Sequence, residues 1–290
     1  MKRRLDGSII ENLKKTDLWK KRIEMDCREG NVFLTIRNNQ VDFYHKGGRL
    51  FSYDKSGFKT HLKYAAAIES SEKNYLTEKE LASHKLALDF ISNYSRIKEN
   101  CSNYSSNEAL GVSQLYKNHS YLSESKVVVI DIEVSFQSLD ENNKHDRIDI
   151  VLYNYSERTL QFVEAKHYSN KEIWSTSKPK VLDQIERYEK QLQSKKQEIL
   201  TEYINYVKII NAIFGVILPE PVNIDKKITL LIFGFDDDQK KGRLKNLILS
   251  NPIYKEKKIY PKGEIKSIAL ENLWNAKQHI KRGKSQYTVE

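Results

Sequence analysis

The chain has few of the cysteine and histidine patterns that stabilise small secreted or metal-bound proteins through disulfides or zinc. It has two cysteines, Cys27 and Cys101, which are too few for a disulfide framework and form no CxxC zinc pair. Its seven histidines form no HxH or HxxxH pair, which argues against a zinc site. With 5 prolines and 11 glycines, long flexible linkers are not expected. Both thiols are expected to be structural, and a reducing compartment fits this composition.

Long hydrophobic runs are also missing. No stretch approaches the roughly 18 apolar residues that a membrane span needs. The N-terminus, MKRRLDGSIIENLKK, contains no apolar signal segment, so we expect a cytoplasmic protein. Hydrophobic residues nevertheless make up 39% of the chain and aromatics 10%, which is more than a disordered chain carries. A folded chain of this length buries about three quarters of its unfolded surface, so a sizeable core is expected.

Positive charge exceeds negative charge by ten, with 49 lysines and arginines against 39 acidic residues. This surplus suggests a polyanionic partner, although solubility alone could account for it. It is concentrated in residues 240–284, where thirteen lysines and arginines face three acidic residues. Contacts from such a segment to phosphates would give salt-dependent affinity without sequence preference. A solvated lysine-rich surface is the equally weighted alternative.

The first third of the chain combines helical segments with a small sheet. Apolar residues alternate at the start of residues 31–54, and the pairs Asn38-Asn39 and Gly47-Gly48 are typical of tight turns. These features predict a three-stranded antiparallel meander. Helices are expected on either side of it, over Ser8–Cys27 and, after the capping-box pattern Thr77-x-x-Glu80, over Thr77–Asn100. A loop over residues 101–107 and a short helix over Glu108–Lys117 are expected next.

The rest of the chain has the pattern of a mixed α/β layer. Apolar, β-branched segments predict strands over residues 126–136, 147–154, 159–168 and 228–235. Helices are expected between the last two strands, beginning after Pro179, and again from Asp237 to Ser250. The order of helix, three strands, helices and strand predicts an α/β fold with a mixed central sheet flanked by helices.

Three charged residues interrupt these apolar strands: Asp149 in RIDIVLYN, and Glu164 and Lys166 in QFVEAKHY. Burying a charge is costly unless it is paired or bound to a metal. Residues two apart in a strand share a face, so Glu164 and Lys166 point the same way. The turn YSER makes the two strands a hairpin that brings Asp149 beside Glu164. Two converging carboxylates suit a hard divalent cation, and a metal with a nearby lysine predicts phosphodiester hydrolysis.

This trio resembles the motif of the PD-(D/E)xK nucleases. The matching residues are Ile148-Asp149 and Glu164-Ala165-Lys166, with isoleucine in place of the proline of "PD". On the following helix, Gln184-x-x-x-Tyr188 is similar to the QxxxY motif of the RecB and lambda-exonuclease branch. The resemblance covers about residues 105–236 and implies a restriction-endonuclease-like core.

The resemblance also implies a role for each matching residue. Asp149 and Glu164 would ligate Mg²⁺ or Mn²⁺, and Lys166 would position the attacking water. Gln184 and Tyr188 would steady the DNA backbone or the lysine.

Members of this superfamily also carry an earlier acidic residue. Glu133, in the strand expected to neighbour Asp149, is our preferred candidate for this catalytic and metal-binding position. Asp131 shares its face of the strand and is a rival. Glu108, on the preceding helix, matches the place where many relatives carry the residue.

Each of these signals has an ordinary structural alternative. A glutamate and a lysine two apart on an exposed strand are common material for cross-strand ion pairs. The run Asp236-Asp237-Asp238 could be a second metal site, but carboxylates also cap helix N-termini, and we favour capping.

We therefore expect residues 1–75 to form an N-terminal accessory region with an antiparallel β-hairpin, and residues 76–290 to form a nuclease domain. The expected activity is Mg²⁺-dependent hydrolysis of DNA, in restriction, phage defence or repair. A homodimer or a separate ATPase or helicase partner would be compatible with it, and no membrane association is expected. The alternatives are a catalytically degenerate nuclease fold that binds nucleic acid or a partner, and a nuclease acting on RNA or branched DNA.

Overall fold

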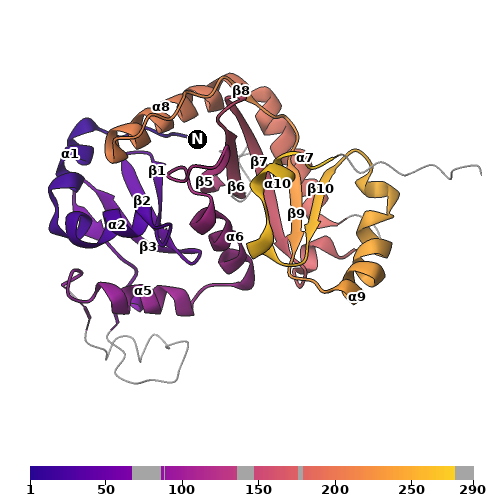
Figure 1. The fold of residues 1–290 in the computed structure, drawn as a ribbon, viewed down its shortest axis with the longest axis horizontal. Coiled ribbons are helices and arrows are strands. Elements are labelled where there is room, and N and C mark those ends of the chain that lie inside the picture. The colour runs from indigo at the N-terminus through magenta and orange to yellow at the C-terminus, as the bar shows by residue number, and fades with distance from the viewer. Residues whose placement is uncertain (67–85, 88, 136–146, 176–178, 278–290) are drawn as a thin grey trace, which may run out of the picture.

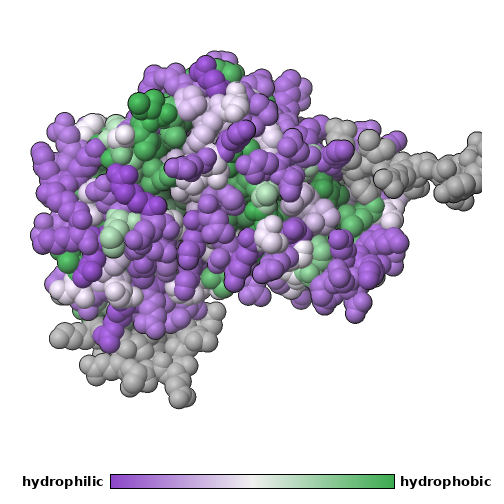
Figure 2. Space-filling view, viewed as in Figure 1, coloured by the Kyte–Doolittle hydropathy of each residue, from purple (hydrophilic) through white to green (hydrophobic). Residues whose placement is uncertain are grey.

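The computed structural model describes residues 1–66, 86–87, 89–135, 147–175 and 179–277. In these residues two sheets lie side by side, with helices around and between them (Figure 1). Hydrophilic side chains cover most of the face shown in Figure 2. None of the helices in these ranges is long and apolar enough to cross a membrane.

The smaller sheet is an antiparallel meander in the order β1-β2-β3-β4. Its strands are β1 Phe33–Arg37, β2 Gln40–His45, β3 Gly48–Asp54 and β4 Gly57–Lys59. The meander predicted for residues 31–54 is confirmed, including the turn at Asn39, whose φ is 53°. The fourth strand was not predicted, because its three residues carry no alternating pattern long enough to detect.

The larger sheet has the order β10-β9-β7-β6-β5, with β8 paired to the start of β7. Its strands are β5 Val127–Ser135, β6 Arg147–Asn154, β7 Thr159–His167, β8 Asn223–Ile224, β9 Thr229–Phe233 and β10 Lys258–Lys262. β5, β6 and β7 pair antiparallel, while β7, β9 and β10 run parallel. The predicted mixed α/β class and its four strands are therefore confirmed.

The helical elements include short 3₁₀ and π turns as well as α-helices. The α-helices are α1 Gly7–Lys15, α2 Glu24–Arg28, α3 Leu62–Ala65, α5 Tyr94–Asn103, α6 Asn107–Asn118, α7 Lys180–Ser194, α8 Lys196–Phe214, α9 Asp237–Gln239 and α10 Leu270–Trp274. The π turns are η1 Trp19–Ile23 and η3 Lys240–Leu249, and the 3₁₀ turns are η2 Lys171–Ile173, η4 Pro252–Tyr254 and η5 Ile265–Ser267.

Two predicted segments differ from the structure. The helix predicted over Thr77–Asn100 is shorter in the described residues, because Leu86 forms a β-bridge with Ala66 and α5 begins only at Tyr94. α5 then continues to Asn103 across the start of the predicted loop at residues 101–107, and the capping pattern at Thr77 lies outside the described residues. β10 lies in the segment expected to be a lysine-rich tail. Only Ile259 of its five residues is buried, because the strand forms the edge of the sheet and needs no hydrophobic run.

The predicted helix after the last central strand is confirmed in two pieces. Asp236 caps α9 by accepting a hydrogen bond from Gln239 N, while the Gln239 side chain accepts one from Asp236 N. This is the capping role that we favoured for the acidic run. The helical path then breaks at Gly242 within η3.

The N-terminal region packs closely on the larger sheet and its helices. Trp19 lies against Phe43 of the smaller sheet and Phe214 at the end of α8, with ring centroids 6.2 and 5.7 Å apart. Gly47, at the β2–β3 turn, meets α6 so closely that a Cβ would lie 2.4 Å from Ala109 Cβ. One hydrophobic core consequently includes residues from both sheets.

Candidate active site

The candidate site begins where β6 and β7 part from one another. Their ladder ends at the pair Ile150 and Val163. Beyond it, the Asp149 carboxylate accepts a 2.8 Å hydrogen bond from the amide of Ala165. On its other edge β7 stays paired with β9 from Val163 to His167. The aspartate side chain therefore takes the place of the next ladder bond, and the motif strand is held from both sides.

Glu164 and Lys166 lie on one face of β7, and both are buried. Lys166 Nζ is 2.8 Å from Glu164 Oε1. The Glu164 side chain is fully buried, and neither of its oxygens accepts a well-directed hydrogen bond from the described residues. A buried carboxylate in this state is costly, so it needs a positive charge close by.

Glu108, on the first turn of α6, completes the acidic group. Its Oε1 lies 4.0 Å from Lys166 Nζ, and its Oε2 accepts hydrogen bonds from His167 N and Asn170 Nδ2 at 3.1 and 2.9 Å. α6 is placed for this by its Ser106 cap, which accepts a hydrogen bond from Ala109 N. The structure therefore brings Glu108, and not the preferred Glu133, to the motif lysine.

Glu133 points elsewhere because β5 is irregular at this point. The register with β6 shifts between Val129 and Asp131, and Glu133 has a left-handed φ of 52°. Its carboxylate pairs with Arg147 at 3.4 Å. The preference for Glu133 rested on β5 lying next to β6, and that pairing is confirmed, but regular side-chain alternation does not hold across such a bulge.

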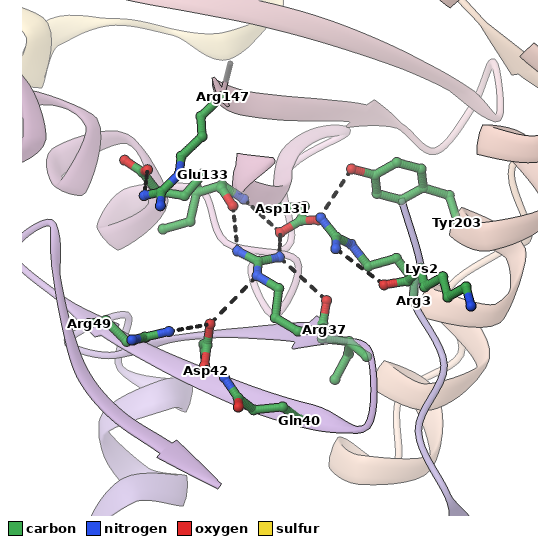
Figure 3. A network of polar contacts seen from close by, with 12 residues as sticks. Lys2, Arg3, Arg37, Gln40, Asp42, Arg49, Asp131, Glu133, Arg147 and Tyr203 are labelled. Atoms are coloured by element: carbon green, nitrogen blue, oxygen red, sulfur yellow. Dashed lines mark hydrogen bonds and ion pairs between the residues drawn. The ribbon is translucent and has the colours of Figure 1, made fainter. Parts of the chain in front are cut away.

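Asp131, the rival candidate, is fully buried in a different network (Figure 3). It pairs with Arg3 at 2.9 Å and Arg37 at 3.0 Å, and Tyr203 Oη donates to it at 3.2 Å. These contacts tie the N-terminus and the smaller sheet to β5. The structure thus gives Asp131 a structural role.

Crowding of carboxylates changes the ionisation of the site. Burial and the neighbouring Glu164 raise the pKa of Asp149 well above its usual range. Burial raises the pKa of Glu164 to about 7, against the opposing effect of Lys166. Burial by itself would lower the pKa of Lys166, but the surrounding carboxylates outweigh it and raise that pKa. A further cation would therefore be favoured here.

The donor set fits a hard divalent cation. Three carboxylates of Asp149, Glu164 and Glu108 surround the motif, and oxygen ligands are what Mg²⁺ and Mn²⁺ prefer. The strongest sign of such a fit is the buried Glu164 Oε2, which has no hydrogen-bond partner among the described residues. Within the described ranges, no three side chains of the metal-binding types are close enough together to coordinate an ion as they are. Binding would therefore require the Lys166 ammonium, which lies among these carboxylates, to move aside.

Gln184 and Tyr188 support β6 from α7. Gln184 Nε2 donates to Tyr188 Oη at 2.8 Å, and Tyr188 Oη donates to the carbonyl of Arg147 at 2.6 Å. Arg147 precedes Asp149 by two residues on β6. This pair therefore positions the start of β6, and with it the aspartate.

Glu172, in η2, is a member of the site that the sequence did not indicate. Its Oε2 lies 3.1 Å from Lys166 Nζ, and its backbone is fixed by the Asn170 cap. Beside it is a cavity of about 330 Å³ lined by Lys171, Trp174 and Lys180. Arg243 stacks 4.2 Å over the Trp174 ring. Only the position of Glu172 just after the motif strand could have suggested it.

Comparison of the chain with known protein families, curated proteins and solved structures finds no match.

Proposed function

We propose that this protein is a metal-dependent nuclease that hydrolyses DNA phosphodiester bonds. The observation that carries this proposal is the buried Glu164 carboxylate, which pairs with Lys166 through Oε1, has no hydrogen-bond partner for Oε2 among the described residues, and is close enough to Asp149 to raise its pKa. A purely structural ion pair would not need three further carboxylates, those of Asp149, Glu108 and Glu172, around one lysine. Such crowding is typical of sites that bind a cation or perform acid–base chemistry.

In this proposal Asp149, Glu164 and Glu108 would hold Mg²⁺ or Mn²⁺. When bound, the ion would supply Lewis-acid stabilisation of the charge that develops on the phosphate oxygens. Lys166 orients the attacking water by hydrogen bonding and balances negative charge as the reaction proceeds. The water oxygen forms a bond to phosphorus while the bond from phosphorus to the sugar oxygen breaks. The water proton leaves to solvent, and the sugar oxygen takes up a proton.

The surface beside the site supports a nucleic-acid substrate. Lys171, Lys180 and Arg243 surround Trp174 next to Glu172. Cationic side chains around an aromatic ring suit a phosphate backbone and its bases. The net charge of +10 would add long-range attraction for such a polyanion.

The experiment uses the purified full chain with linear DNA, circular DNA and RNA in Mg²⁺, Mn²⁺ or EDTA. Cleavage of DNA by the wild type, lost in EDTA and in Glu164→Gln and Lys166→Ala, is the expected result. Asp17→Asn, which removes one carboxylate of an exposed ion pair with Lys21, is the matched control and should cut normally. Cleavage of RNA alone would change the substrate and leave the chemistry in place.

One observation favours a second function, that of a degenerate nuclease fold which only binds. Lys166 already neutralises the buried Glu164. Within the described residues, no three acidic, histidine or cysteine side chains are placed to bind a metal ion without rearrangement. A thermal melt with and without Mg²⁺ separates the two functions. The nuclease proposal expects a higher melting temperature in Mg²⁺, whereas a binding module would show none.

A further inference from the structure

A cavity of about 600 Å³ opens between the two sheets, away from the motif strand. The smaller sheet forms one wall, and the N-terminus of α6, the end of β5 and the start of β6 form the other. Its most informative lining residues are Arg37, Arg49, Arg147, Tyr44, Tyr64 and Tyr104. A volume of this size is in the range of small-molecule sites, about 300–1,000 Å³.

Two of the arginines that line the cavity, Arg49 and Arg147, each contact a single carboxylate in the network of Figure 3. The Arg49 and Arg147 side chains are 57% and 63% exposed. Their contacts to Asp42 and Glu133 are long, at 3.7 and 3.4 Å. Exposed pairs of this kind are worth little, and a guanidinium has five donors. A phosphate could therefore replace either carboxylate with two parallel hydrogen bonds.

The backbone at the cavity is unusual at one residue, Glu133. Glu133 is one of the cavity residues and adopts the left-handed conformation that non-glycine residues rarely use. Strained residues of this kind gather at functional sites. Here the strain places the Glu133 carboxylate beside Arg147 at the cavity rim.

The cavity and the candidate active site share two elements. Ser105, Ser106 and Ala109 at the start of α6 line the cavity, while Glu108 of the same turn faces Lys166. The positive end of this 12-residue helix adds to the arginines in favouring an anion.

β6 makes the second connection. Arg147 and Asp149 lie on one face of that strand, with Cα atoms about 7 Å apart by strand geometry. That distance is roughly the rise of two nucleotides along one DNA strand. A strand whose phosphate is at the motif would therefore bring a phosphate about two nucleotides away to the cavity.

We propose that this cavity binds a backbone phosphate of the nucleic-acid strand close to the bond being cut. The smaller sheet then acts as a wall of the substrate site, through Arg49. The tyrosine rings are half-buried or buried, and Lys63 covers Tyr64 and Tyr104 at 5.1 and 4.5 Å, so the cavity presents cations and not open stacking faces. Recognition there is of phosphate and is independent of base sequence. The identity of the ligand as nucleic acid rests on the proposed function.

The test measures binding of a fluorescent DNA oligonucleotide by anisotropy, in EDTA so that nothing is cut, over a series of salt concentrations. The variants are Arg49→Ala, Arg147→Ala and their combination, with Lys21→Ala as the control that removes an exposed cation from η1. Thermal melts confirm that each variant is folded. Each arginine variant should lower the salt slope by about 1, and the combination should weaken binding at least about tenfold. The control should leave both unchanged.

Salt slopes equal to that of the wild type in both arginine variants would overturn the proposal. A second measurement tests binding of a mononucleotide 5′-phosphate to the same variants. If the arginine variants lose this binding but bind the oligonucleotide as the wild type does, the cavity serves a free nucleotide and the proposal is overturned. The cleavage assay is read separately. Arginine-dependent binding without cleavage would refute the nuclease proposal and would leave the cavity as a binding site for a nucleic-acid phosphate, without a bond being cut beside it. Cleavage together with binding that does not depend on the arginines would support the nuclease proposal and refute the cavity proposal.

Discussion

Lys166 Nζ lies 2.8 Å from Glu164 Oε1, and the two side chains lie on the same buried face of β7. The lysine pairs with one oxygen of this carboxylate, and the other oxygen has no hydrogen-bond partner among the described residues. Much of the behaviour of the site follows from this one pair.

Replacing Lys166 should destabilise the chain by more than the loss of its own buried side chain would. Lys166→Met leaves the buried Glu164 without its cation, and breaking a buried pair in this way costs about 3–5 kcal/mol. Chemical denaturation should show a loss of this size. Adding Glu164→Gln to the same chain should recover part of it, because the uncompensated charge is then gone. A double variant as unstable as the single one would contradict this account of the pair.

Glu108 should be the acidic residue that the metal requires. Its carboxylate lies 4.0 Å from Lys166 Nζ, whereas Glu133 pairs with Arg147. Mg²⁺ should raise the melting temperature of the wild type and of Glu133→Gln, and the rise should be much reduced in Glu108→Gln. Ligand present at 100 times its dissociation constant contributes about 2.7 kcal/mol, which a thermal melt detects readily. Loss of the Mg²⁺ effect in Glu133→Gln alone would restore the assignment made from sequence.

Gly111 should be essential for the position of α6. A Cβ at this residue would lie 2.2 Å from the Phe233 ring of β9, so the helix could not approach the sheet as it does. Gly111→Ala should cost about 1–3 kcal/mol through overpacking and should reduce cleavage by moving Glu108. Gly7→Ala is the control, because a Cβ there meets nothing within 4 Å. Equal stability of the two variants would mean that the contact at Phe233 relaxes without cost.

Acid should weaken the fold through His45. This side chain is buried at the end of β2, where burial lowers its pKa to about 4, and its Nδ1 lies 2.7 Å from the carbonyl of Asn31. Because the folded pKa is below the unfolded value of about 6.5, the stabilisation is complete above that pH and is lost as pH falls toward 4. The loss should amount to about 3 kcal/mol. Unfolding of His45→Gln between pH 7 and 4 should lack this component, and a pH dependence identical to the wild type would contradict it.

The parts of the site that lie on adjacent strands could be predicted from the sequence. Apolar flanks marked the strands around Asp149 and Glu164, and a short turn between β6 and β7 made them neighbours. The structure confirms both strands and brings the Asp149 carboxylate to the amide of Ala165. Short-range pairing of this kind follows from side-chain alternation and turn length alone.

The contributions from distant parts of the chain could not be predicted in the same way. Glu108 reaches Lys166 because Gly111 lets α6 pack closely on Phe233 of β9, the strand next to β7, and no local pattern encodes that contact. Glu133 turns away because β5 contains a bulge and a left-handed residue, and alternation gives no warning of either. The edge strand β10 has one buried residue, so the hydrophobic pattern of the sequence does not predict it. In each case tertiary contacts override the local signal.

The most direct test of the central claim is Mg²⁺-dependent cleavage of DNA by the wild type and by Glu164→Gln at matched concentration, with folding verified by thermal melt. We expect the wild type to cut DNA and the variant to lose at least about a hundredfold of that rate while remaining folded. A wild type that never cuts DNA, or a folded Glu164→Gln variant that cuts as fast as the wild type, would contradict the account.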